Sequence, residues 1–171
     1  MIVAGTGHRP DKLPLGYHPL MMDVMKRTVR LMLPAGTSEL VSGLALGWDT
    51  ALALVALEDG IPLTAAIPFR GQEARWRDHD QLRYRRILRR ANRVEVVSPG
   101  GYSAVKMQTR NMWMVDYSGV ILSLWDGTDA GTANCLRYAE GEGVRVIHCW
   151  DTFSRLCELY GDKIDTDWSL L

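Results

Sequence analysis

Short apolar runs alternate with longer amphipathic segments along this chain, and no other feature constrains the fold as strongly. The expected strands span residues 2–5, 39–42, 63–67, 93–97, 120–125 and 144–148. The expected helices span 18–33, 48–59, 74–90, 104–117, 132–142 and 152–160, and the last ten residues are expected to form a tail. Regular alternation of strands and helices predicts βαβ units. We therefore expect an α/β fold with a mostly parallel, doubly wound sheet and helices on both faces.

Composition indicates one ordinary globular domain. The chain has 171 residues, 47% of them hydrophobic, with 20 basic and 20 acidic side chains. These values exclude intrinsic disorder and argue against a protein that mainly coats DNA. No apolar run approaches the roughly 20 residues of a membrane span, and the first residues lack the basic segment of a signal peptide. Three cysteines, an odd number, fit a reducing compartment. We expect a cytoplasmic protein.

Glycine and polar residues gather in the segments that follow the expected strands. These segments are 6–10, 43–49, 68–73, 98–102 and 126–134. In a parallel sheet the carboxyl ends of the strands meet at one edge, where ligands bind beside the point at which the strand order reverses. Glycine lets the backbone approach a ligand closely, and each following helix offers free N–H groups. The five loops together predict one pocket for a polar ligand, and phosphate suits it best.

Each loop alone has a plainer interpretation. Gly43 and Gly47 could form a tight turn, and Asp49 could simply be a favourable acid in the first turn of a helix. Gly131 with the residue after it could be an ordinary helix start. The combination of the five loops favours a binding site over these separate explanations.

Several of these segments resemble a known family. Two motifs follow the first two strands, Thr6-Gly7-His8-Arg9-Pro10 and Ser42-Gly43-Leu44-Ala45-Leu46-Gly47-Trp48-Asp49. The third loop contains Ile67-Pro68-Phe69, followed by Gln72 and Trp76. Together they resemble the YpsA-like family of the SLOG superfamily, which is named for the Smf/DprA DNA-processing proteins and the LOG enzymes. Residues 107–114 and 127–132 resemble LOG segments, and the resemblance covers residues 2–147.

The resemblance implies a Rossmann-like fold that binds nucleotides or nucleotide-derived ligands. The implied division is a Rossmann-like nucleotide-binding domain over residues 1–150, with a short helix and tail of the same domain over 151–171. LOG enzymes cleave the bond between a base and ribose 5′-monophosphate with an arginine and a glutamate. Arg110 stands at the arginine position, but Cys135 stands at the glutamate position.

Loss of that glutamate matters because breaking an N-glycosidic bond needs a carboxylate. If the chain is an enzyme, we expect Arg110 to be catalytic, with Glu73 or Asp49 as the substitute acid. No cofactor is expected.

The expected ligand-binding residues come from three of the five loops and one helix. They are Gly7, His8, Arg9, Gly43, Gly47, Asp49, Arg110, Gly131, Thr132 and Asn134. We expect the ligand phosphate at Gly131, Thr132 and the start of the following helix. Arg110 and Arg9 would bind it, and Asp49 would accept a ribose hydroxyl. Trp48, Trp76, Trp125 and Tyr102 are candidates to stack on a base, although a core role is favoured for each tryptophan.

Residues 70–93 hold nine arginines and no lysine. They could form a nucleic-acid surface, or a solvated helix face or oligomer interface. The zero net charge favours the latter two. We expect a homodimer or higher homo-oligomer without a nucleic-acid or membrane partner. Asp78-His79-Asp80 is not expected to bind metal, because adjacent residues on a helix do not share a face.

Three function classes follow. The first is a sensor or sequestering protein that binds a nucleotide-derived small molecule, of the ADP-ribose or cyclic nucleotide type. The second is a LOG-like phosphoribohydrolase of nucleoside 5′-monophosphates, and the third is a DprA-like DNA-processing protein. Cys135 at the glutamate position favours the first class over the second. The neutral charge disfavours the third.

Overall fold

A single parallel sheet forms the centre of the molecule. The computed structural model describes residues 1–129 and 131–168, with side chains through residue 161; Ala130 and residues 169–171 of the expected tail lie outside the described residues. The strands are β1 (Ile2–Gly7), β2 (Glu39–Ser42), β3 (Leu63–Ile67), β4 (Arg93–Val96), β5 (Val120–Leu124) and β6 (Arg145–His148). Their order is β4-β3-β2-β1-β5-β6, and every neighbouring pair is parallel. This confirms the expected Rossmann-like α/β fold.

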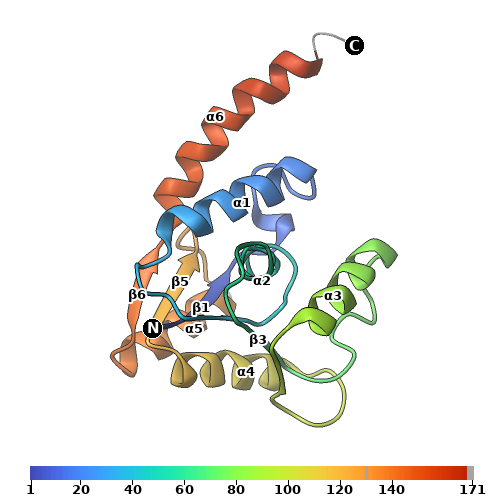
Figure 1. The fold of residues 1–171 in the computed structure, drawn as a ribbon, viewed down its shortest axis with the longest axis vertical. Helices are drawn as coiled ribbons and strands as arrows, with labels where there is room; N and C mark the ends of the chain where they lie inside the picture. Colours follow the sequence, from blue (N-terminus) through green and yellow to red (C-terminus); the bar gives the residue numbers. More distant parts are fainter. Residues whose placement is uncertain (130, 169–171) are drawn as a thin grey trace.

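Helices cover both faces of the sheet. They are α1 (Pro19–Met32), α2 (Trp48–Asp59), α3 (Asp78–Arg90), α4 (Ala104–Tyr117), α5 (Gly131–Gly141) and α6 (Trp150–Trp168). Figure 1 shows α1 and α4 on opposite sides of β1 and β5. Buried side chains of α1, α2, α3 and α6 share one hydrophobic core, and those of α4 and α5 share another.

The alternation of side chains along β1 separates these two cores. Val3 points into the core beneath α1 and α2, whereas the next residue, Ala4, points into the core beneath α4 and α5. Adjacent residues of a strand face opposite sides of the sheet. Helix α2 is apolar on nearly all sides and almost completely buried, which is typical of a helix enclosed by a sheet and other helices.

Trp48 fixes the end of β1 against the start of α2. The indole is completely buried and donates its Nε1–H to the carbonyl oxygen of Leu122 at 3.1 Å. A Cβ atom on Gly7 would lie 2.7 Å from this ring. This confirms the core role of Trp48 and explains the glycine at the end of β1.

Two helices differ from the sequence expectation. Helix α3 begins at Asp78, because residues 71–76 form turns in which Ala74 N–H donates to Gly71 and Trp76 N–H to Glu73. Helix α6 continues to Trp168, so most of the expected tail is helical. Figure 1 shows α6 running past α1 and away from the sheet. No helix in the described ranges is both long and apolar enough to cross a membrane.

Candidate functional site

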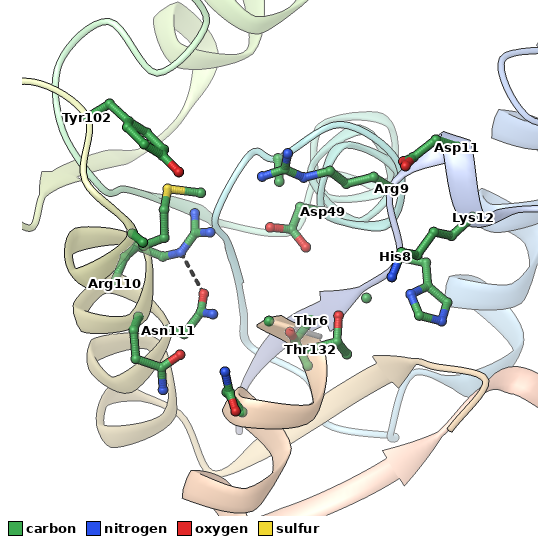
Figure 2. Close-up of a pocket in the computed structure, with 17 residues that line it drawn as sticks. Thr6, His8, Arg9, Asp11, Lys12, Asp49, Tyr102, Arg110, Asn111 and Thr132 are labelled. Carbon is green, nitrogen blue, oxygen red and sulfur yellow. Dashed lines mark hydrogen bonds between the residues drawn. The ribbon is translucent and has the colours of Figure 1, made fainter. Parts of the chain in front are cut away.

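A cavity of about 500 Å³ opens at the carboxyl edge of the sheet (Figure 2). It lies at the end of β1, which has β2 on one side and β5 on the other. The strand order reverses there, and ligands of doubly wound folds bind at this point. The volume falls within the range of small-molecule sites, roughly 300–1,000 Å³.

The cavity brings together eight of the ten ligand-binding residues expected from the sequence. These are Gly7, His8, Arg9, Asp49, Arg110, Gly131, Thr132 and Asn134. Sequence reasoning missed several further lining residues, namely Thr6, Asp11, Lys12, Ala45, Ala104, Met107, Gln108 and Asn111. Asp11 and Lys12 belong to a short 3-10 helix, Pro10–Lys12, and only its proline hinted at it.

The other two expected residues, Gly43 and Gly47, lie behind the cavity wall. Gly47 has a φ of 92°, and a Cβ there would lie 2.6 Å from the carbonyl oxygen of His8. A Cβ on Gly43 would overlap the guanidinium of Arg110 and lie 2.8 Å from Oδ2 of Asp49. These glycines let the second loop pack closely against the first loop and against Arg110.

Arg110 forms part of the floor of the cavity and is only 4% exposed. Its Nη1 donates to the carbonyl oxygens of Gly43 at 2.5 Å and Ala66 at 3.4 Å, and its Nε donates to Oδ1 of Asn111 at 2.9 Å (dashed in Figure 2). Burial lowers the pKa of this guanidinium. Arg110 therefore joins α4 to the ends of β2 and β3, a structural role that the sequence did not indicate.

Asp49 is the buried acid of the cavity. Figure 2 shows its carboxylate between the side chains of Arg9 and Arg110. Burial raises the pKa of Asp49, although the charge of Arg110, the backbone N–H of Ala45 and the charge of Arg9 each oppose the shift. A buried acid facing a cavity can accept hydrogen bonds from ligand hydroxyl or N–H groups.

The pKa of Asp49 leads to a prediction about stability. A folded pKa above the unfolded value of about 3.9 means that folding favours the protonated acid. The stability of the wild type relative to Asp49→Asn should be highest below pH 4 and fall as the pH rises through the folded pKa. The slope should approach at most about 1.4 kcal/mol per pH unit. Urea unfolding of both proteins from pH 3.5 to 8 measures this slope. An unfolding free energy of the wild type that rises with pH relative to that of Asp49→Asn would contradict the raised pKa.

The first turn of α5 forms another side of the cavity. Gly131 is exposed and Thr132 is nearly buried, and both line the cavity together with Thr6 (Figure 2). The N–H groups at a helix start have no partner within the helix, and the helix dipole favours an anion there. This side of the cavity can therefore hold a phosphate group.

Cys135 lies beneath that turn as part of the core. Its thiol is buried and hydrogen-bonded to the Thr6 side chain. Burial raises the pKa of this thiol to about 11. Cys135 is therefore a neutral packing residue and cannot replace a carboxylate.

His8 ties the first loop to the loop after β5. Its Nε2 lies 2.7 Å from Oδ1 of Asp126, which also accepts hydrogen bonds from the backbone N–H and hydroxyl of Thr128. The bonds from Thr128 and His8 hold the pKa of Asp126 well below its usual range. Sequence reasoning did not assign this role to Asp126, and its only signal was an acid two residues before a threonine in a turn.

The structure does not place Glu73 in the cavity. Its carboxylate lies 3.2 Å from Nε of Arg85, and the third loop contributes no lining residue. That loop supports the floor from behind, because Gln72 donates to the carbonyl oxygen of Gly43 at 3.2 Å and accepts from Tyr84 at 3.3 Å. Four of the five expected loops thus line the cavity, and Asp49 is the buried acid among its lining residues.

Similar proteins point to the same family as the sequence motifs. The model of the YspA SLOG family matches residues 6–140. The uncharacterized SPbeta prophage-derived protein YoqJ of Bacillus subtilis is 34% identical over 116 residues, which cover 58% of this chain and 68% of YoqJ. These matches confirm the resemblance found in the sequence motifs.

Two solved structures show the same fold. DNA processing protein A (DprA) from Streptococcus pneumoniae aligns with a TM-score of 0.62 and 19% identity over 94% of this chain. The chain spans 56% of the length of that protein. The molybdenum cofactor binding protein from the phototrophic bacterium Rippkaea orientalis aligns with a TM-score of 0.57 and 16% identity, over 92% of this chain and 84% of that one.

Proposed function

This chain belongs to the YspA SLOG family, and from that premise we propose that it binds a nucleotide-derived small molecule as a sensor or sequestering protein. The ligand is of the ADP-ribose or cyclic nucleotide type. The observation that carries the proposal is the composition of the cavity. A buried acid, a buried arginine and an open helix start surround one space of about 500 Å³.

The proposed pose assigns each part of a nucleotide to one side of the cavity. The phosphate lies at Gly131 and Thr132, where the N–H groups of α5 begin. Arg9 supplies positive charge from the first loop, and Asp49 accepts a ribose hydroxyl. Tyr102 is 75% exposed at the rim and can stack on a base.

Binding is favoured over hydrolysis because the residue at the glutamate position and one of the two substitute acids cannot act in the cavity. Cys135 is a neutral thiol, and Glu73 is paired with Arg85 outside the cavity. The second candidate remains a LOG-like phosphoribohydrolase, in which Asp49 with its raised pKa would protonate the leaving base beside Arg110.

Calorimetric titration tests the proposal with four compounds: ADP-ribose, AMP, 2′-deoxy-AMP and inorganic phosphate. We expect saturable binding of the ribonucleotides to the wild type. Asp49→Ala should weaken them by about tenfold or more, the value of one hydrogen bond to a charged group, and leave phosphate unchanged. Chromatography of the same mixtures for free base separates binding from hydrolysis. Failure of all the nucleotides to bind at millimolar concentration would refute the proposal.

We also propose that the protein is a cytoplasmic homo-oligomer. Cys135, Cys149 and Cys157 are all free thiols, which fits a reducing compartment. Val105 and Met112 leave apolar surface exposed on α4, and a second copy could cover it. Light scattering measures the mass of the protein in solution, and a monomeric mass would contradict the homo-oligomer.

A further inference from the structure

Positive charge is concentrated at one end of this molecule. Residues 70–93 carry nine arginines and three acids, whereas the whole chain has 20 basic and 20 acidic side chains. The remainder of the chain therefore has an excess of acids. The basic segment comprises the third loop and α3, which Figure 1 shows at the margin of the fold, away from α5.

Part of this charge is neutralised on the inner side of α3. Arg77 and Arg83 lie 3.4 and 2.9 Å from the carboxylate oxygens of Asp80, which is 97% buried by its surroundings. Arg85 lies 3.2 Å from Glu73. These pairs hold α3 and the preceding turns in place, so their arginines serve the fold.

Arg93 is also paired, with its Nη2 2.7 Å from a carboxylate oxygen of Glu95. The other five arginines are exposed and have no acidic partner among the residues whose side chains the structure describes. Arg70, Arg75, Arg86 and Arg89 form no ion pair with any residue whose side chain the structure describes. Arg90 makes one long contact, 3.5 Å to a backbone carbonyl oxygen. Residues three and four apart lie on the same side of a helix. Arg86, Arg89 and Arg90 therefore form one outer face of α3.

We propose that this outer face of α3, with Arg70 of the third loop and Arg75 of the turns before α3, binds the phosphate backbone of a single-stranded nucleic acid. Every charge on the surface is a guanidinium, whose planar fork matches two phosphate oxygens. The arginines lie on a convex helix and do not line the cavity, so an extended polyanion fits them better than a small molecule. A symmetric contact between two copies of α3 would oppose like charges.

Two features favour a single strand over a duplex. The backbones of a duplex lie on both sides of a major groove about 12 Å wide, whereas one helix face offers one row of cations. Tyr102 also exposes 75% of its surface beside the third loop, and Phe69 contacts its ring edge-on with the centroids 6.1 Å apart. An open aromatic face next to cations is typical of single-strand binding surfaces.

Fluorescence anisotropy of a labelled oligodeoxynucleotide, titrated at several salt concentrations, tests the proposal. Arg86→Ser/Arg89→Ser should weaken binding about tenfold at low salt. It should also make the slope of log K against log salt shallower by about 1.4, because each phosphate contact of a single strand releases roughly 0.7 counterions. Lys26→Ser/Arg30→Ser is the matched control, since it removes the same charge from α1, where both cations pair with Glu58. The control should stay within twofold of the wild type.

Three results would overturn the proposal. The first is equal affinity and salt slope in the wild type and in Arg86→Ser/Arg89→Ser. The second is tighter binding of the corresponding duplex. The third is competition by polyglutamate as effective as by unlabelled oligonucleotide, which would indicate an acidic protein as the partner. Nucleotide titrations of the cavity should be the same in Arg86→Ser/Arg89→Ser and the wild type, so this surface and the cavity are tested separately.

Discussion

Arg110→Ala is expected to lower the free energy of unfolding by about 2–4 kcal/mol, in addition to weakening the binding of any ligand. Removing the guanidinium takes a buried donor from the carbonyl oxygens of Gly43 and Ala66. An unsatisfied buried polar group costs about 1–3 kcal/mol, although Gly43 keeps its bond from Gln72. The buried Asp49 also loses the positive charge that most favours its ionised form. Urea unfolding at neutral pH measures the loss.

Arg137→Ala is the matched control for this prediction. That side chain is 62% exposed on α5 and lies 3.4 Å from the exposed Asp129, so its loss should cost less than about 0.5 kcal/mol. Equal unfolding free energies for the two variants would contradict the structural role of Arg110. From the sequence alone we expect weaker binding with the fold intact; the buried contacts predict both losses together.

Much of the fold follows from the sequence, because clear sequence signals mark where its helices and strands begin and end. The predicted segments 39–42, 48–59, 63–67 and 104–117 coincide with β2, α2, β3 and α4. Gly60 ends α2 in a left-handed conformation, as a glycine after a helix predicts. Gly161 carried a weaker signal: a glycine costs a helix only about 1 kcal/mol, and α6 continues through it.

The site was predictable where topology alone determines it. Loops after parallel strands must meet at one edge, so the cavity could be expected from the positions of Arg9, Asp49 and Thr132. Contacts that depend on how deeply a side chain is buried could not be predicted from the sequence. The space beside Gly43 that admits Arg110, and the turn that directs Glu73 to Arg85, exist only once the loops have packed.

Arg9→Ala/Thr132→Val is expected to abolish most nucleotide binding while leaving the fold intact. Neither side chain forms a hydrogen bond or ion pair within the part of the chain that the structure describes, and both line the cavity. Figure 2 shows Arg9 extending over the cavity toward Asp49. A hydrogen bond to a charged phosphate contributes about 1.5–3 kcal/mol. Losing two such hydrogen bonds should weaken the affinity for the nucleotide by roughly 10²–10⁴-fold.

Calorimetry with the tightest-binding ribonucleotide measures this loss, and thermal unfolding tests the fold. Arg27→Ala/Thr109→Val makes the same two substitutions at exposed positions outside the cavity, and it should bind like the wild type. Affinity retained by Arg9→Ala/Thr132→Val would place the phosphate away from α5. Affinity lost together with thermal stability would show that these residues support the fold and do not bind the ligand. Only a loss of affinity at unchanged stability agrees with a phosphate held between the first loop and the start of α5.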